Sequence, residues 1–189
     1  MPVEGKSVNQ SVPIFNKDIV RFVIKLIALV IIWECSYYFI LIPTRIPDKG
    51  LTDFITSGTT HCLNLFSSAT SKYTWKDFPE TNAARIFNNG KYVFYIADIC
   101  NGLSLLAIYC GFIILLPYPV KRKIVFCVGG IIALTIANII RCVSLYWIFR
   151  HHADLFELNH HYVFTIFMYL LIFLGWILFT KKTKPNEVR

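Results

Sequence analysis

Charged side chains are scarce in this sequence. They make up 16% of its 189 residues, whereas an average soluble domain has about a quarter. Apolar residues reach 56%, and the mean hydropathy is +0.55. These values exclude an ordinary water-soluble domain, a disordered chain and a coiled coil. The length allows one domain, so we predict a single membrane domain over residues 1–189.

Familiar cofactor and metal motifs are also missing. The cysteines form no CxxC pair and no Cys/His pattern of zinc spacing. We therefore expect no metal and no cofactor. The net charge of +8 does not indicate a nucleic-acid partner, because the basic residues stand at the ends of apolar runs rather than on one amphipathic face. The six cysteines are Cys35, Cys62, Cys100, Cys110, Cys127 and Cys142.

Long apolar runs are what the sequence does contain. The runs over residues 20–42, 123–145 and 162–180 approach the roughly 20 residues that cross the hydrocarbon core of a bilayer. A fourth run, over residues 99–116, is shorter and ends at Pro117-Tyr118-Pro119, so we expect it to start near the membrane surface. The pattern predicts an all-α integral membrane fold with about four transmembrane helices.

Two segments between the runs 20–42 and 99–116 are too polar to cross the bilayer. Residues 51–70 place apolar side chains at helical spacing among polar ones, which predicts an amphipathic helix on the outer interface. Residues 71–98 contain Asn88-Asn89-Gly90 and mixed charges, and we expect an extracytoplasmic loop there.

The positive charges predict the orientation in the membrane. Eleven of the 19 Lys and Arg residues fall in the short segments 1–25, 117–123 and 181–189, whereas 8 are spread over 44–98 and 141–161. Positive loops stay on the cytoplasmic side. We therefore expect a multi-pass protein of the cytoplasmic (inner) membrane, with both termini in the cytoplasm.

Three kinds of reactive side chain are expected at one depth in this membrane. Arg141 and Cys100 each lie about 17 residues from the cytoplasmic turn at 117–123, and His160 and His161 lie about 20 residues from the cytoplasmic end of the last run. At about 1.5 Å per residue, these counts bring a guanidinium, a thiol and an imidazole to one layer near the outer surface. Polar residues at membrane depth are candidates for function.

These residue types can carry acyl transfer. Cys100 would be the nucleophile, because backbone N–H groups at the start of a helix lower a thiol pKa and can hold an oxyanion. A histidine would take and return the proton. Arg141, which stays charged, would bind the substrate carbonyl or keep the thiolate ionised. We expect Asn138, Asn101 and Gly102 to orient these groups or to contact the substrate.

Each of these residues also has a non-catalytic interpretation. A membrane cysteine commonly serves packing, Arg141 could reach the outer headgroups, and the pairs His151-His152 and His160-His161 could lie at the interface or bind a metal. The protein would then be a non-catalytic assembly or transport subunit that binds an anionic lipid or polymer through Arg141. A third hypothesis is a metal- or haem-handling membrane protein.

Three short motifs follow one another in the second half of the chain: Cys100-Asn101-Gly102-Leu103-Ser104, Asn138-Ile139-Ile140-Arg141 and Asn159-His160-His161-Tyr162-Val163-Phe164. Their order resembles that of the exosortase/archaeosortase family of membrane cysteine transpeptidases. The similarity covers about residues 92–180, with a matching hydropathy profile. Many family members have Ser-Gly after the cysteine, where this chain has Asn101-Gly102, and the histidine is doubled here.

The resemblance implies an integral enzyme with its site on the extracytoplasmic face of the membrane. Its partner would be a membrane-anchored exported protein with a C-terminal sorting signal: a short motif, a transmembrane helix and a basic tail. The enzyme would cleave near the outer end of that helix and transfer the acyl group to an envelope acceptor. By motif, Cys100 is the nucleophile, Arg141 the stabilising cation, and His161 the acid/base, with His160 as the alternative.

Overall fold

The computed structural model describes residues 17–66, 71–74 and 83–181 of a mostly helical chain. The predicted all-α, membrane-compatible fold is confirmed, with the addition of one small sheet. Parts of the predicted basic termini (1–16, 182–189), of the interfacial helix (67–70) and of the loop (75–82) lie outside the described residues. The helices are α1 (Lys17–Ser36), α2 (Ile42–Thr44), α3 (Asp48–Phe66), α4 (Leu103–Leu115), α5 (Val120–His151), α6 (Phe156–Leu158) and α7 (Phe164–Thr180), and the strands are β1 (Ser71–Thr74), β2 (Ala83–Asn88) and β3 (Lys91–Ala97).

Among the described residues, three helical stretches are long and apolar enough to cross a membrane. They are Val20–Thr44, Val120–His151 and Phe156–Thr180, and each extends beyond the corresponding predicted span. The fourth apolar helix, α4, has 13 residues, which is about 20 Å at helical rise. It therefore covers only part of a hydrocarbon core about 30 Å thick.

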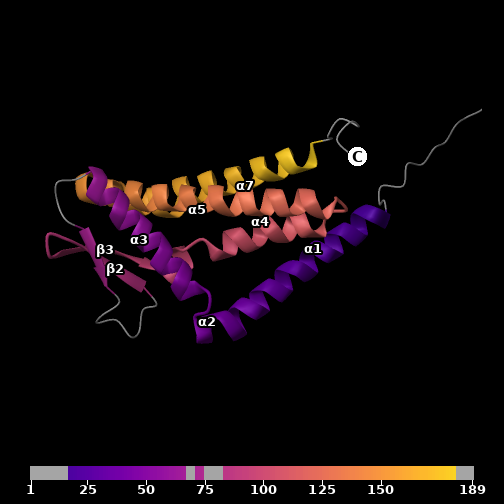
Figure 1. The fold of residues 1–189 in the computed structure, drawn as a ribbon, viewed down its shortest axis with the longest axis horizontal. Coiled ribbons are helices and arrows are strands. Elements are labelled where there is room, and N and C mark those ends of the chain that lie inside the picture. Colours follow the sequence, from indigo (N-terminus) through magenta and orange to yellow (C-terminus); the bar gives the residue numbers. More distant parts are fainter. Residues whose placement is uncertain (1–16, 67–70, 75–82, 182–189) are drawn as a thin grey trace, which may run out of the picture.

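The helices α4, α5 and α7 lie side by side, and α1 leans away from them toward its C-terminal end (Figure 1). The start of α1, the turn between α4 and α5, and the end of α7 lie at one end of the bundle (Figure 1). Helix α3 and the sheet lie at the opposite end. The basic residues of the described part of the three predicted cytoplasmic segments therefore share one end of the molecule.

Two cations of the basic turn also close the ends of neighbouring helices. Arg122 Nη2 donates hydrogen bonds to the carbonyl oxygens of Phe179 (2.6 Å) and Lys181 (2.8 Å). Lys123 Nζ donates to the carbonyl oxygen of Ile114 at 2.8 Å. The last carbonyls of a helix have no partner within the helix. These side chains therefore satisfy backbone groups at the ends of α4 and α7.

The segment predicted as a loop contains a three-stranded antiparallel sheet, so that prediction is wrong over most of its described residues. The sheet has the strand order β1-β2-β3. Asn89 (φ 50°) and Gly90 (φ 78°) join β2 to β3, and positive φ at both residues suits the two-residue hairpin turn that Asn-Gly favours. Buried Phe94 and Ile96 alternate with the exposed Tyr95 along β3, which is the two-residue period of a half-buried strand.

Helix α3 uses its polar face for packing, which differs from the predicted interfacial helix. Thr52, Ile55, Thr56, Thr59, Thr60 and Leu63 are buried, and the helix contacts α5 and the sheet. The hydroxyls of Thr56, Thr59 and Thr60 donate to carbonyl oxygens one turn earlier, at 2.7 to 3.0 Å. Threonine can be buried on a helix because its hydroxyl bonds to the helix backbone. The apolar side chains left exposed on α3 include Phe54, Leu65 and Phe66.

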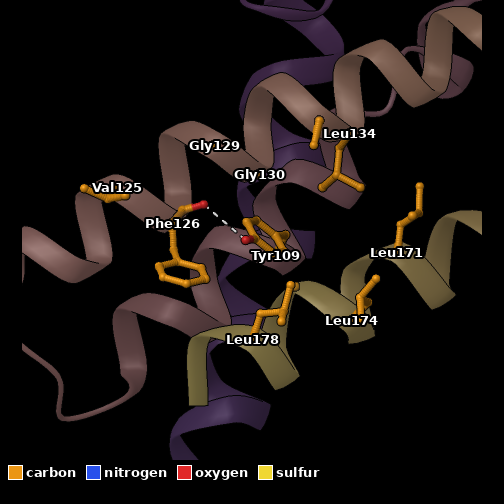
Figure 2. A pocket seen from close by; sticks show the side chains of 11 residues that line it. Tyr109, Val125, Phe126, Gly129, Gly130, Leu134, Leu171, Leu174 and Leu178 are labelled. Atoms are coloured by element: carbon orange, nitrogen blue, oxygen red, sulfur yellow. Dashed lines mark hydrogen bonds between the residues drawn. The ribbon is translucent and has the colours of Figure 1, made fainter. Parts of the chain in front are cut away.

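The membrane part packs around the ring of Tyr109 on α4. Its hydroxyl donates to the carbonyl oxygen of Phe126 at 3.1 Å, beside a groove of about 400 Å³ between α5 and α7 (Figure 2). The ring lies against Gly130 on α5 and Gly175 on α7. The groove is almost entirely apolar, and the hydroxyl of Tyr109 is bonded to backbone. Gly130 is eight residues, about 12 Å of helix, before Asn138, so the groove is separate from the candidate site residues.

We expect Gly130→Ala to destabilise the folded protein by about 1–3 kcal/mol, since overpacking a filled core has that cost. A Cβ at position 130 would overlap the ring of Tyr109, whereas a Cβ at Gly129 would meet no atom within 4 Å. Gly129→Ala is therefore the matched control. Thermal unfolding in one detergent checks this, and equal midpoints for the two variants would contradict the close contact between ring and backbone.

Candidate active site

Cys100 lies in a short connection between the sheet and the membrane part. Strand β3 ends at Ala97, residues Asp98–Cys100 form a 3₁₀ turn, and α4 starts at Leu103. The turn is closed by the N–H of Asn101, which bonds to the carbonyl of Asp98 at 3.1 Å. Cys100 is a free, partly buried cysteine, and it precedes the first turn of α4 rather than lying within a transmembrane helix.

A buried polar network fixes this connection to α3. The amide nitrogen of Asn101 lies 2.8 Å from Asp48 Oδ1 and 3.2 Å from Thr52 Oγ1. The hydroxyl of Thr52 donates to Asp98 Oδ1 at 2.7 Å. Arg45 holds the other oxygen of Asp98, with Nε at 3.0 Å and Nη2 at 2.9 Å. Asp98 and Asn101, on either side of Ile99 and Cys100 in the sequence, are therefore both bonded to side chains of α3.

Asp48 is the least exposed acid of this network, with 2% of its surface accessible. Burial raises the pKa of the Asp48 carboxyl above its ordinary value. The hydrogen bond from Asn101 lowers this pKa, the neighbouring Asp98 raises it, and Arg45 lowers it. Asn101 and Arg45 therefore favour the ionised form that burial disfavours.

Asn138 joins α5 to the backbone of the cysteine turn. Its side-chain amide, on a residue only 1% exposed, donates to the carbonyl oxygens of Cys100 (3.1 Å) and Asn101 (2.9 Å). Its oxygen accepts a hydrogen bond from Arg141 Nη1 at 3.2 Å. Asn138 therefore has the predicted contact with Arg141, and it also holds the loop that carries the thiol.

Gly102 makes the approach of Asn138 possible. Its φ is +88°, and a Cβ there would lie 3.3 Å from the Asn138 amide nitrogen. A left-handed conformation is costly for residues other than glycine. The backbone conformation of the turn therefore explains why a glycine stands at this position.

His160 is the histidine beside Cys100. Its Nε2 lies 3.8 Å from the thiol sulfur, and its ring stacks on Phe156 with centroids 5.6 Å apart. His161 points elsewhere: its Nε2 lies 3.1 Å from Glu157 Oε2, and its side chain is 62% exposed. The preference for His161 as the residue facing the thiol is therefore wrong, and the alternative, His160, has that position.

The local helix geometry explains this difference. Residues Asn159–Val163 form a π-helical turn between α6 and α7, and the helical stretch begins at Phe156 rather than at Tyr162. Neighbouring residues on a helix point about 100° apart, so direction decides which histidine faces Cys100. The two histidines differ by only one residue, about 1.5 Å, along the helix axis, and this difference does not decide which of them contacts the thiol.

Arg141 lines a cavity of about 240 Å³ next to the cysteine turn. Its Nε is buried and has no hydrogen-bond acceptor within the described part of the chain. The guanidinium is therefore available to a group that enters the cavity. The other lining residues are Ile99, Gly102, Ser104, Leu105, Thr165, Met168 and Tyr169.

Several residues of the site were not identified from the sequence. Arg45, Asp48 and Thr52 belong to the network around Cys100, although they lie about 50 residues before it. Thr165 and Tyr169 line the cavity from α7. Asp98, two residues before Cys100, forms an ion pair with Arg45. No local signal predicts these contacts, because each depends on the tertiary fold.

Comparison with known proteins adds no relative: no family model, no curated protein and no solved structure matches this chain.

Proposed function

We propose that the protein is a membrane-embedded cysteine peptidase or transpeptidase of the exosortase/archaeosortase type. It cleaves the C-terminal sorting signal of exported proteins and transfers the acyl fragment to an envelope acceptor. The observation that carries this proposal is the 3.8 Å approach of His160 Nε2 to the sulfur of Cys100. Catalytic hydrogen bonds in free enzymes are commonly long and tighten on substrate binding.

Arg141 supports the same chemistry from α5. Through Asn138 it is tied to the carbonyl of Cys100, and it faces a cavity large enough for a peptide carbonyl group. A guanidinium that is only partly solvated is a strong partner for developing negative charge. It takes the role of the stabilising cation.

The reaction follows the usual order for a cysteine nucleophile. His160 takes the thiol proton, and Sγ of Cys100 attacks the carbonyl carbon of the scissile bond. The electron pair of the carbonyl moves to its oxygen, where Arg141 stabilises the oxyanion. When the C–N bond breaks, the amine leaves with the proton from His160, and a thioester remains on Cys100. An acceptor amine or water then gives its proton to His160, attacks the thioester and releases the thiol.

We assign this site to the extracytoplasmic side of the cytoplasmic membrane, with both termini in the cytoplasm. The support is the common position of the basic residues at the end of the bundle opposite the sheet. An epitope tag inserted between Asn89 and Gly90 should be detected on intact spheroplasts. A tag inserted between Tyr118 and Pro119 should need permeabilised cells. Equal accessibility of both tags would contradict the orientation.

The function itself is tested by comparing exported proteins in cells with and without the chain. We expect some membrane-anchored proteins to lose a C-terminal helix and its basic tail only when the chain is present. Mass spectrometry of C-terminal peptides measures this and identifies the substrate. If no exported protein changes its C terminus, the peptidase proposal fails.

A second candidate function is a non-catalytic subunit that binds an anionic lipid or polymer. The buried Arg141 Nε without a partner among the described residues favours it. Such a subunit needs Arg141 but tolerates alanine at Cys100. The two functions are therefore separated by the cysteine.

A further inference from the structure

The outer edge of β3 leads directly to the candidate nucleophile. In the strand order β1-β2-β3, β3 pairs with β2 on one side, with Tyr95 opposite Arg85 and Ala97 opposite Ala83. On its other side no described residue forms a hydrogen bond with the backbone of β3. An unpaired edge of this kind offers a row of N–H and C=O groups to an extended peptide. Only two residues separate its last residue, Ala97, from Cys100.

A cavity lies where this strand ends. It measures about 330 Å³, and Tyr95, Ala97 and Ile99 line it from β3 and the cysteine turn. The rest of the lining consists of Tyr37 and Ile42, at the end of the first membrane helix, together with Arg45, Asp48 and Asp98. Tyr95 and Ala97 are two residues apart and share one face of β3, so a peptide strand placed beside this part of β3 would direct alternate side chains toward this cavity. The charged groups of this lining are bonded to one another or to Thr52 and Asn101, and most of the accessible wall is apolar. The cavity therefore suits a large uncharged side chain.

The direction of the chain determines how such a peptide would run. Strand β3 starts at the Asn89-Gly90 hairpin, far from the basic end of the bundle, and runs toward the membrane helices (Figure 1). A substrate with a C-terminal transmembrane helix follows the same course: an extended segment outside the membrane and then a helix inside it. A peptide parallel to β3 would therefore bring its last extended residues to Cys100.

We propose that the substrate segment before the scissile bond binds as an added strand, parallel to the outer edge of β3, with one side chain in the cavity beside Tyr95. This inference rests on the proposed function, since it names the binding mode of that peptidase. Backbone hydrogen bonds to β3 supply the affinity, and the cavity supplies the selectivity. The recognised class is an extended peptide with a large uncharged side chain at one position.

The probes for the test are acetylated alanine peptides that end in a chloromethyl ketone, which alkylates a reactive thiol. The full chain in detergent is treated with the one-residue and the four-residue reagent, and adducts at Cys100 are quantified by peptide mapping. We expect the four-residue reagent to react about tenfold faster or more, the gain of a few net hydrogen bonds. N-methylation of single amides should remove this gain at every second position. Phenylalanine at one position should increase the rate further.

Two variants complete the experiment. Tyr95→Ala should remove the preference for phenylalanine, while Tyr73→Ala, on the opposite edge strand β1, should leave it unchanged. Iodoacetamide, which is too small to pair with β3, should label Cys100 equally in both variants, and this shows that the site is intact.

The outcomes separate this proposal from the proposed function. If neither iodoacetamide nor any ketone labels Cys100, the cysteine is not a nucleophile and the proposed function fails. If Cys100 reacts but the rate depends neither on peptide length nor on alternate N-methylation, the site is reactive and the added strand is refuted. A preference for phenylalanine that survives Tyr95→Ala would overturn the role of the cavity.

Discussion

Replacing Cys100 by alanine or by serine is expected to abolish cleavage of the exported substrate. The loss should be on the order of 10³-fold or more, as for other nucleophile substitutions. Serine is expected to fail as well, because the hydroxyl lacks the acidity of the thiol at neutral pH. The measurement is the fraction of substrate that retains its C-terminal helix, at matched levels of the variant in the membrane.

Other cysteines of the chain provide the controls for this prediction. Cys62 on α3 and Cys35 on α1 are also free, and Cys62→Ala and Cys35→Ala should process substrate at close to the normal rate. Normal processing by Cys100→Ala would refute the peptidase and would favour the anion-binding subunit. Loss of processing in all the cysteine variants would indicate a general effect on folding.

Replacing His160 by alanine is expected to reduce turnover by about 10²–10⁴-fold, the usual contribution of a general acid/base. The reason is its position, with Nε2 3.8 Å from the sulfur of Cys100. The membrane level of the variant should remain close to normal. The measurement is the rate of substrate cleavage in membranes that contain equal amounts of each variant.

His161→Ala is the matched control, since this neighbouring side chain is exposed and contacts Glu157. It should retain most of the activity. The reverse result, an inactive His161→Ala beside an active His160→Ala, would show that the side chain facing Cys100 in the structure is not the acid/base. If both variants were active, neither histidine would serve that function.

The common level of the site residues along the bundle could be predicted from the sequence because the rise of a helix is nearly constant. Counting residues from the basic ends of the apolar runs brings Cys100, Arg141 and the two histidines to one level, and the contacts among Cys100, Asn138, Arg141 and His160 are those of a single layer. The direction of a side chain around the helix axis is less predictable. The π-helical turn at Asn159–Val163 changes this direction, and no residue type in that segment predicts such a turn.

Local signals in residues 71–98 are sufficient to predict the sheet, although the same segment also has features of a loop. Asn89-Gly90 is a strong hairpin turn, and the segment after it, Lys91–Ala97, is rich in aromatic and β-branched residues. In a chain dominated by membrane helices, the mixed charges of this segment favour the loop interpretation. The pairing of β3 with β2 is what buries Phe94 and Ile96.

The network that holds the cysteine turn could not be predicted from the sequence. Asp48, Thr52 and Asp98 are ordinary polar residues when considered one at a time, and α3 looks like a helix on a membrane surface. Their bonds form only when α3 packs its threonine face against the end of β3 and α5. Arg45 and Asp98 are 53 residues apart, so spacing along the chain carries no signal for their contact.

The central claim, that Cys100 forms a covalent acyl intermediate, is tested most directly by trapping that intermediate. The full chain and the exported substrate identified by its shortened C terminus are mixed in detergent, quenched in acid and digested, and the Cys100 peptide is analysed by mass spectrometry. We predict a thioester between Cys100 and the new C-terminal residue of the substrate, which neutral hydroxylamine converts to a free thiol and a substrate hydroxamate. Substrate cleavage that proceeds with no adduct on Cys100, and that continues in Cys100→Ala, would contradict the account.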